Sequence, residues 1–266
     1  MLATNILLSG NNYHKIALLF RFMNMGIVTK STFFAVQDSY CVDPIEEFWQ
    51  ENRSAIINRL RAKDHAVAIA DGRMDSPGHC AQYCSYTTMD CESRDIINIT
   101  TVDKRETNRN SVAMEKEGFI RAMDQLLSEI PLKEMCTDAH VQIKALVDPK
   151  RGRYGDRGVI HTLDMWHGVK SLAKKLHAAG QVKGQTEILQ WLKDIVNHFW
   201  GLWRGVLYHV TGRHEWAFGR CLHEQLNDED REKEWIQKDS PAYLALIGVV
   251  LNKKWLKDVP KFLNFR

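Results

Sequence analysis

Apolar residues recur every three or four positions through the first sixty residues, which predicts a helical region over residues 1–62. Its clearest helix begins at Asp43-Pro44, because a capping side chain followed by a first-turn proline favours a helix start. Two shorter helices are predicted before it, at residues 12–24 and 29–40, with Gly26 between them. The pair resembles a helix-turn-helix, but the apolar residues of its second helix favour packing or dimerisation over DNA reading.

From Ala66 the pattern changes to strands, which are predicted at residues 66–70, 80–88 and 96–102. Their joints are short, and the first turn is expected at residues 75–78, so the three strands form an antiparallel meander. Three helices then alternate with two strands, at residues 111–130, 134–137, 139–147, 159–165 and 168–179. This β-β-β-α-β-α-β-α order predicts an α/β protein with an RNase H-like mixed sheet over residues 63–180.

Beyond Gly180 the pattern becomes helical again and is rich in tryptophan and charge. We interpret residues 181–266 as a helical insertion or appendage of the predicted sheet domain. No internal repeat or low-complexity segment is visible along the chain.

Charge and cysteine content narrow the functional classes. The 266 residues include 36 Lys and Arg against 33 Asp and Glu, so a nucleic-acid surface would have to come from local clusters. The chain has no leader pattern and no apolar run near the roughly 20 residues that cross a bilayer. We therefore expect a soluble intracellular protein, in the nucleus or cytoplasm, with no membrane partner. The six scattered cysteines are expected to be reduced, with Cys80 and Cys84 as small core residues on one side of a strand.

Two aspartates lie at the ends of strands that such a fold makes neighbours. Asp71 ends the first strand and Asp138 follows the fourth, and two carboxylates there could hold Mg²⁺ or Mn²⁺. The alternatives are a hairpin turn at Asp71-Gly72 and a helix cap at Asp138. Pro77 and Gly78 would fit poorly in a returning strand, which places the turn at residues 75–78 and keeps Asp71 in the sheet. Asp75 competes for the role of first acid, although a turn role is its commoner one.

Four stretches carry a resemblance to a known family: residues 70–78 (Ala-Asp-Gly-Arg-Met-Asp-Ser-Pro-Gly), 110–119 (Asn-Ser-Val-Ala-Met-Glu-Lys-Glu-Gly-Phe), 136–143 (Cys-Thr-Asp-Ala-His-Val-Gln-Ile) and 163–167 (Leu-Asp-Met-Trp-His). Together they resemble the transposase-like proteins of Kolobok-type DDE DNA transposons, over residues 5–266. The resemblance implies an RNase H-like domain with an Asp-Asp-Glu triad that cuts and rejoins double-stranded DNA with Mg²⁺ or Mn²⁺. It also implies a homo-oligomer.

The same resemblance assigns individual residues. Asp71 matches the first acid, Asp138 the second, and Asp164 with His167 a shared Cys/Asp-x-x-His signature. That signature pair either orients a metal-site residue or target phosphate, or forms a buried hydrogen-bonded pair between strand and helix. The implied third acid, a glutamate, follows a segment like residues 255–266, where this sequence ends. Internal alternatives are Glu187, Asp194 and Glu215.

Two further groups of residues suggest binding chemistry. His209, His214, Cys221 and His223 could hold a structural zinc ion, although their spacing fits no strict zinc-finger pattern. Basic clusters along the chain could contact DNA phosphates or could simply be solvated surface. The candidate phosphate contacts in them are Lys150, Arg151, Arg153, Lys170 and Lys174.

The sequence thus leads to two hypotheses. The first is a transposase-derived DNA-binding protein whose DDE-type metal-dependent nuclease and strand-transfer core is C-terminally truncated and, without its third acid, inactive. The alternative is a non-catalytic scaffold on the same fold that binds DNA or protein, with a structural zinc ion. Metal-dependent DNA nicking distinguishes the two.

Overall fold

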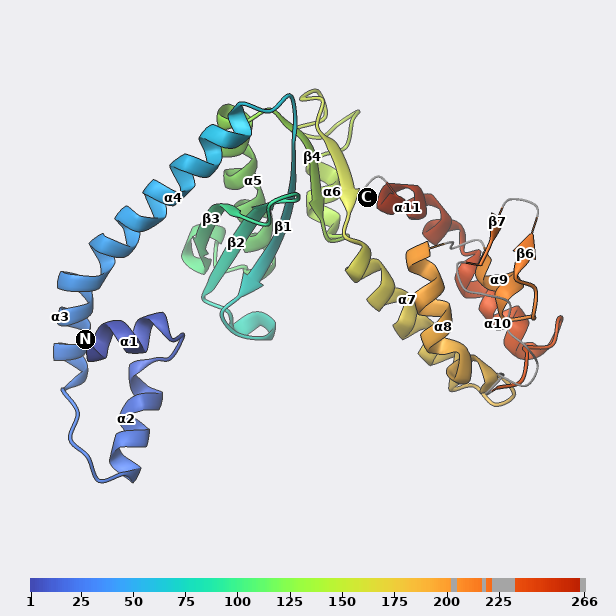
Figure 1. Ribbon diagram of the computed structural model, residues 1–266, viewed down its shortest axis with the longest axis horizontal. Coiled ribbons are helices and arrows are strands. Elements are labelled where there is room, and N and C mark those ends of the chain that lie inside the picture. Colours follow the sequence, from blue (N-terminus) through green and yellow to red (C-terminus); the bar gives the residue numbers. More distant parts are fainter. Residues whose placement is uncertain (202–204, 217–218, 222–232, 264–266) are drawn as a thin grey trace.

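A five-stranded mixed sheet forms the centre of the protein in the computed structural model, which describes residues 1–201, 205–216, 219–221 and 233–263 (Figure 1). Strands β1 (Ala66–Met74), β2 (Tyr83–Asp90) and β3 (Ile96–Asp103) form the predicted antiparallel meander. Strand β4 (Leu132–Thr137) pairs in parallel with β1, and β5 (Ile160–Leu163) in parallel with β4. The order across the sheet is β3-β2-β1-β4-β5, so the prediction of an α/β protein with a mixed sheet is confirmed.

Helix α5 (Ser111–Glu129) packs on the sheet through a core that the strand alternation creates. Ala66, Ala68 and Ala70 of β1 are buried on one face, and their small side chains let α5 approach closely. From α5 the core includes Ala122 and the larger side chains of Phe119, Met123 and Leu126. Helix α6 (Val141–Leu146), in the crossover between β4 and β5, adds the buried Ile143.

Helix α4 (Asp43–Arg61) leads from the sheet to the N-terminal helices (Figure 1). Its Arg53 donates to the backbone oxygen of Ile97 at 2.8 Å and to the Glu129 carboxylate at 3.1 Å, which ties α4 to β3 and α5. The N-terminal helices are α1 (Leu2–Leu8), α2 (Tyr13–Phe22) and α3 (Lys30–Gln37), and a π-helical turn at Asp38–Val42 joins α3 to α4. Helix α1 was not predicted; it packs Ala3 and Ile6 against Phe33 of α3 in a small separate core.

Helix α7 (Met165–Gly180) leads from β5 to the C-terminal helical region (Figure 1). That region contains α8 (Glu187–Gly201), α9 (Val206–His209), β6 (Glu215–Trp216), β7 (Gly219–Arg220), α10 (Pro241–Val250) and α11 (Lys253–Leu263). Its buried core runs without a break from Leu163 of β5 through Leu172 and Leu176 of α7 to Trp191 of α8. The β6–β7 hairpin was not predicted, because two-residue strands leave too little alternation to recognise.

The cysteine prediction was partly wrong. Cys84 is buried in β2 as expected, but Cys80 is exposed in a short 3-10 turn before the strand. The turn extends further than the sequence suggested, so β2 begins at Tyr83 and Cys80 has no place in the sheet. All six cysteines are unpaired. None of the described helices is both long and apolar enough to cross a membrane.

Candidate functional site

Aspartates occupy matching positions on three adjacent strands of the sheet, within β1 and directly after β4 and β5. Ile69 of β1 is the register partner of Cys136 in β4, so Asp71 and Asp138, each two residues further on, lie side by side. Thr137 is in turn the partner of Leu163 in β5, which places Asp138 next to Asp164. The backbone N–H of Asp164 donates to the Thr137 oxygen at 2.7 Å, which continues the pairing. Parallel strands thus gather three carboxylates at one edge, where ligands of such sheets bind.

Asp71 belongs to the strand and not to a turn. Asp71 pairs with Thr87 of β2, and the β1–β2 ladder continues beyond this pair to Met74 and Cys84. The turn therefore lies beyond residue 74, as predicted. Its own Oδ1 accepts a hydrogen bond from the Gly72 N–H at 2.8 Å. Asp75, the competing first acid, is held in the turn, where its Oδ1 accepts from the Gln82 N–H at 3.0 Å.

Asp138 does not cap the helix that follows it. Helix α6 begins at Val141 with His140 as its N-cap residue, later than the expected start at Ala139. The Asp138 carboxylate instead accepts from the His140 N–H at 3.0 Å, an Asx turn that directs the chain away from the sheet. The half-buried side chain is therefore fixed at the strand end by its own backbone.

Glu115 is a fourth acid at this edge, and it was not among the residues predicted for the site. It lies in the second turn of α5, beside Glu117, which instead pairs with Arg121 on the outer side at 2.9 Å. Burial, with Asp138 and Asp71 nearby, raises the pKa of Glu115 to about 7. A Cβ at Gly72 would lie 2.6 Å from the Glu115 Cγ, so only glycine at that position lets the side chain lie against β1.

Three of the acids, Asp71, Glu115 and Asp138, lack a Lys or Arg partner within the described part of the chain. Partial burial raises the pKa of Asp71 despite the Gly72 N–H and His167. The fully buried Tyr86 hydroxyl has no hydrogen-bond partner within the described part of the chain, and its pKa is raised by burial and by Glu115, Asp71 and Asp138. Negative charge concentrated without compensation marks a functional site more often than a structural one.

Asp164 and His167 form a hydrogen-bonded pair where β5 leads into α7, which is one of the two arrangements predicted for them. Asp164 is the N-cap of α7, and its Oδ1 accepts from the Trp166 N–H at 3.0 Å. Its Oδ2 lies 2.6 Å from Nδ1 of His167, and both side chains are about a third exposed rather than buried. A proton on Nδ1 shared with Asp164 leaves Nε2 as the acceptor nitrogen. When the ring carries a second proton, its positive charge lowers the pKa of Asp71.

The predicted basic residues divide between two places. Lys150 and Arg151 lie in the loop before β5, at the opposite end of that strand from Asp164, and Arg153 in the same loop pairs with Asp124 at 2.7 Å. Lys170 and Lys174 are exposed on α7, the helix that starts at Asp164. The Lys170 ammonium lies 4.7 Å from the ring centre of Trp166, which is 53% exposed. Of these basic residues, only Lys170 and Lys174 lie on an element that begins beside the acids, because Asp164 is the N-cap of α7.

The proposed internal third acids lie in the helical region. Asp194 of α8 pairs with Lys233, while Glu187 begins α8 and Glu215 lies in β6. The structure therefore brings none of these three to the strand ends, where Glu115 lies instead.

A second group of side chains that could hold a metal ion such as zinc lies between α8, α9 and β7. One ligand atom each from His198, His209 and Cys221 lies within 4.8 Å of the others. His209 and Cys221 belong to the predicted zinc set, and the His214 ring centre is 5.1 Å from that of His209. His223 lies outside the described residues. The sequence missed His198 because one histidine within an apolar helix carries no spacing signal.

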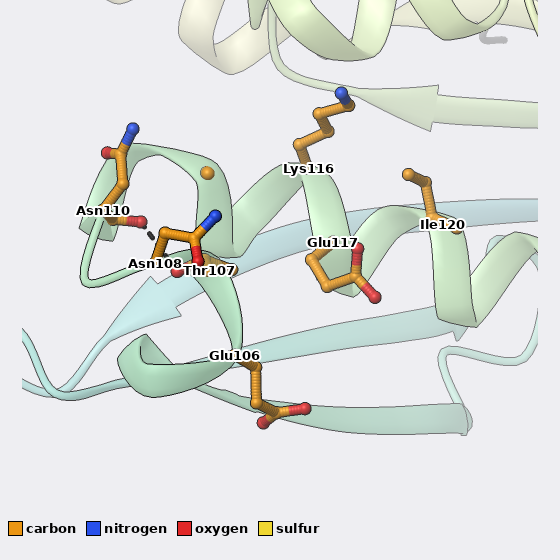
Figure 2. Close-up of a pocket in the computed structure, with 8 residues that line it drawn as sticks. Glu106, Thr107, Asn108, Asn110, Lys116, Glu117 and Ile120 are labelled. Carbon is orange, nitrogen blue, oxygen red and sulfur yellow. Dashed lines mark hydrogen bonds between the residues drawn. The ribbon is translucent and has the colours of Figure 1, made fainter.

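An open pocket of about 440 Å³ at the start of α5 lies apart from these groups (Figure 2). Its lining is Glu106, Thr107, Asn108, Asn110, Ala113, Lys116, Glu117 and Ile120. The Thr107 hydroxyl donates to the backbone oxygen of Asn110 at 2.9 Å across one end. None of the predicted site residues lines the pocket, and we assign it no role.

The close contact at Gly72 gives a first prediction. Gly72→Ala is expected to push Glu115 off β1 and to lower the free energy of unfolding by about 1–3 kcal/mol, because the added methyl overpacks the site. Chemical denaturation measures this change. Gly248→Ala in α10, whose Cβ would meet nothing within 4 Å, is the control and is expected to stabilise by up to about 1 kcal/mol. Equal effects of the two substitutions would contradict the contact.

Comparison with known proteins adds no relative. No protein-family model matches the chain, and no curated protein matches it. A function is therefore inferred from the geometry of the acids and of the histidine–cysteine group.

Proposed function

We propose that this chain is a DNA-binding protein of the DDE transposase type, whose RNase H-like core binds divalent cations through Asp71, Glu115 and Asp138 and acts on phosphodiester bonds. The observation that carries the proposal is the set of aspartates at matching positions on β1, β4 and β5, with Glu115 close to Asp71 and Asp138. Within the described part of the chain, no Lys or Arg pairs with Asp71, Glu115 or Asp138. The sheet order β3-β2-β1-β4-β5 supports the fold assignment, because an antiparallel meander extended by two parallel strands is the topology expected from an RNase H-like element order.

The donor set fits Mg²⁺ or Mn²⁺. Both are hard cations that prefer carboxylate oxygens, and three carboxylates at one edge provide such ligands, with no neutralising Lys or Arg among the residues that the structure describes. The chemistry that such a cation supplies is activation of water and stabilisation of negative charge on a phosphate. Asp71, Glu115 and Asp138 would hold it.

The surrounding residues prepare the acids for that role. Glu115 retains its proton up to a pH of about 7, so it avoids mutual repulsion with Asp71 and Asp138 until a cation replaces the proton. Asp164 fixes the orientation and tautomer of His167, whose Nε2 then remains available to accept a hydrogen bond. Gly72 keeps the space for Glu115 open.

Glu115 alters the expectation that the core is inactive. The predicted defect was the missing third acid, and α5 supplies a third carboxylate from within the described chain. We therefore propose that cation binding requires no acid from a later segment.

The competing function is a scaffold that binds DNA or protein without catalysis. Purified full-length protein should nick supercoiled DNA in Mg²⁺ or Mn²⁺ and not in a chelator, if the proposal holds. DNA binding of equal strength with and without cation, and no nicking in either, would instead support the scaffold.

The α7 lysines give a second prediction, on DNA affinity. Lys170 and Lys174 point from one exposed side of the helix that starts at Asp164, so they are expected to contact phosphates when DNA reaches the acids. The double variant Lys170→Ala with Lys174→Ala should weaken duplex binding about tenfold and reduce its salt dependence by about one unit of slope per lysine. Fluorescence anisotropy at several salt concentrations measures both.

The matched control removes two charges from the far end of β5. Lys150→Ala with Arg151→Ala should change DNA affinity by less than about threefold, since these residues precede β5. A larger loss in the control than in the α7 variant would reverse the assignment of the DNA surface.

A further inference from the structure

Three side chains from separate segments converge in the helical region. His198 lies near the end of α8, His209 is the last residue of α9, and Cys221 directly follows β7. The Cys221 Sγ lies 3.4 Å from Nε2 of His198 and 3.4 Å from Nδ1 of His209. The two rings have centres 4.4 Å apart, and His209 and Cys221 are each only 5% exposed. One buried sulfur thus faces two imidazole nitrogens at equal distance.

We propose that His198, His209 and Cys221 bind a structural zinc ion, with His214 as the fourth ligand. Zinc bonds of about 2.3 Å to sulfur and about 2.0–2.1 Å to nitrogen, arranged tetrahedrally, put sulfur and nitrogen about 3.5 Å apart. Both sulfur–nitrogen distances match this value. A single thiol proton can be donated to only one ring at a time, whereas a metal ion binds both nitrogens and the sulfur together.

His214 is already held beside the other three. The Cys221 N–H donates to the backbone oxygen of His214 at 2.8 Å, which aligns these two segments. The His214 ring centre lies 5.1 Å from that of His209 and 5.5 Å from that of Trp235, so His214 would have to turn toward the other three residues to supply the fourth nitrogen. Three histidines and one cysteine, with no open position, are a structural rather than a catalytic set.

The local fold explains why a metal ion would be needed. Helix α9 spans four residues and strands β6 and β7 two each, so regular backbone pairing contributes little to this part of the chain. Cys221 is 23 residues from His198 and 12 from His209, so one ion would join segments that are distant in sequence.

The site adjoins the core that supports α7. Trp191 of α8 meets the His209 ring edge-on at 5.7 Å and stacks on Trp235 at 5.2 Å. That core continues through α7 to Leu163 and Met165, the residues on either side of Asp164. Zinc would therefore stabilise the body against which α7 packs, and this inference stands whether or not the acids prove to be catalytic.

Metal analysis of the purified full-length chain tests the proposal. Mass spectrometry of the dissolved metal should find about one zinc per chain, and removal by a chelator should lower the melting temperature by about 5 °C or more. Cys80→Ser, at an exposed thiol, should retain the zinc, whereas Cys221→Ser and His198→Ala should lose it. A folded wild-type chain that contains no zinc and takes none up, or a Cys221→Ser variant that retains it, would overturn the proposal.

Cobalt substitution gives a spectroscopic readout of the ligand set, and its wild-type measurement does not depend on how well the variants fold. Wild-type protein loaded with Co²⁺ should show the visible bands of tetrahedral coordination and a near-ultraviolet thiolate charge-transfer band. His214→Ala should weaken the visible bands while the thiolate band remains. Octahedral spectra in the wild type, or identical spectra in wild type and His214→Ala, would contradict the ligand set.

Discussion

Asp138→Asn is expected to abolish cation-dependent nicking of supercoiled DNA, with a loss of about 1000-fold or more. Losing a carboxylate ligand removes several kcal/mol of charge stabilisation, and about 1.4 kcal/mol corresponds to a factor of ten in rate. The amide oxygen of asparagine can still accept the His140 N–H, so the strand end keeps its shape. Gel analysis of plasmid nicking in Mn²⁺ and in Mg²⁺ measures the loss.

The control for this variant is Asp75→Asn. Asp75 competed with Asp71 in the sequence, but its carboxylate accepts from the Gln82 N–H inside the turn. Nicking should stay within about twofold of wild type, because the asparagine oxygen preserves that hydrogen bond. If Asp75→Asn abolished nicking and Asp138→Asn did not, the first and second acids would have to be assigned again.

Glu115→Gln is expected to stabilise the cation-free protein and at the same time to destroy its response to cation. The pKa of Glu115 is about 7 in the folded chain against an ordinary value of 4.5, so the folded state binds an extra proton between these values. Stability therefore falls as the pH rises from about 4.5 through about 7, and the cost of the ionised side chain is fully present above that range. Glutamine removes this cost, which is worth about 2 kcal/mol after allowance for solvent screening.

Thermal unfolding at two pH values tests this sign. At about pH 8 without cation, Glu115→Gln should melt several degrees above wild type, and at about pH 4 the two should nearly coincide. Adding Mn²⁺ at about pH 8 should raise the melting temperature of the wild type and leave the variant unchanged. Glu117→Gln, which removes an ion pair with Arg121, should not stabilise at either pH. A destabilised Glu115→Gln at about pH 8 would contradict the buried, repelled carboxylate.

Much of the sheet could be predicted because its signals are local. Alternation in β1, β2 and β3, the turn at Pro77 and Gly78, and the capping residues of α5 are each visible over a few positions. Asp71 and Asp138 followed from the strand order, since parallel strands end at the same edge. Asp164 fell at that edge for the same reason, although the exact register of β4 with β5 needed the structure.

Glu115 and His198 could not be predicted, because what distinguishes them is contact between distant segments. In the sequence Glu115 looks the same as Glu117, and only the packing of α5 on β1 shows that one faces Gly72 and the other Arg121. Gly72 was the available signal, since glycine within a strand often marks a close approach, but it was weighed as a turn residue. His198 likewise becomes a ligand only when α8 meets the end of α9.

The most direct test of the central claim is a titration of the full-length chain with Mn²⁺, followed by electron paramagnetic resonance of the free ion. The wild type should show saturable binding that strengthens as the pH rises through about 7, as the proton leaves Glu115. Glu115→Gln and Asp138→Asn should each weaken binding by about tenfold or more, with Glu117→Gln unchanged. Binding that is absent in the wild type, or equal in all four proteins, would show that these acids are not a cation site.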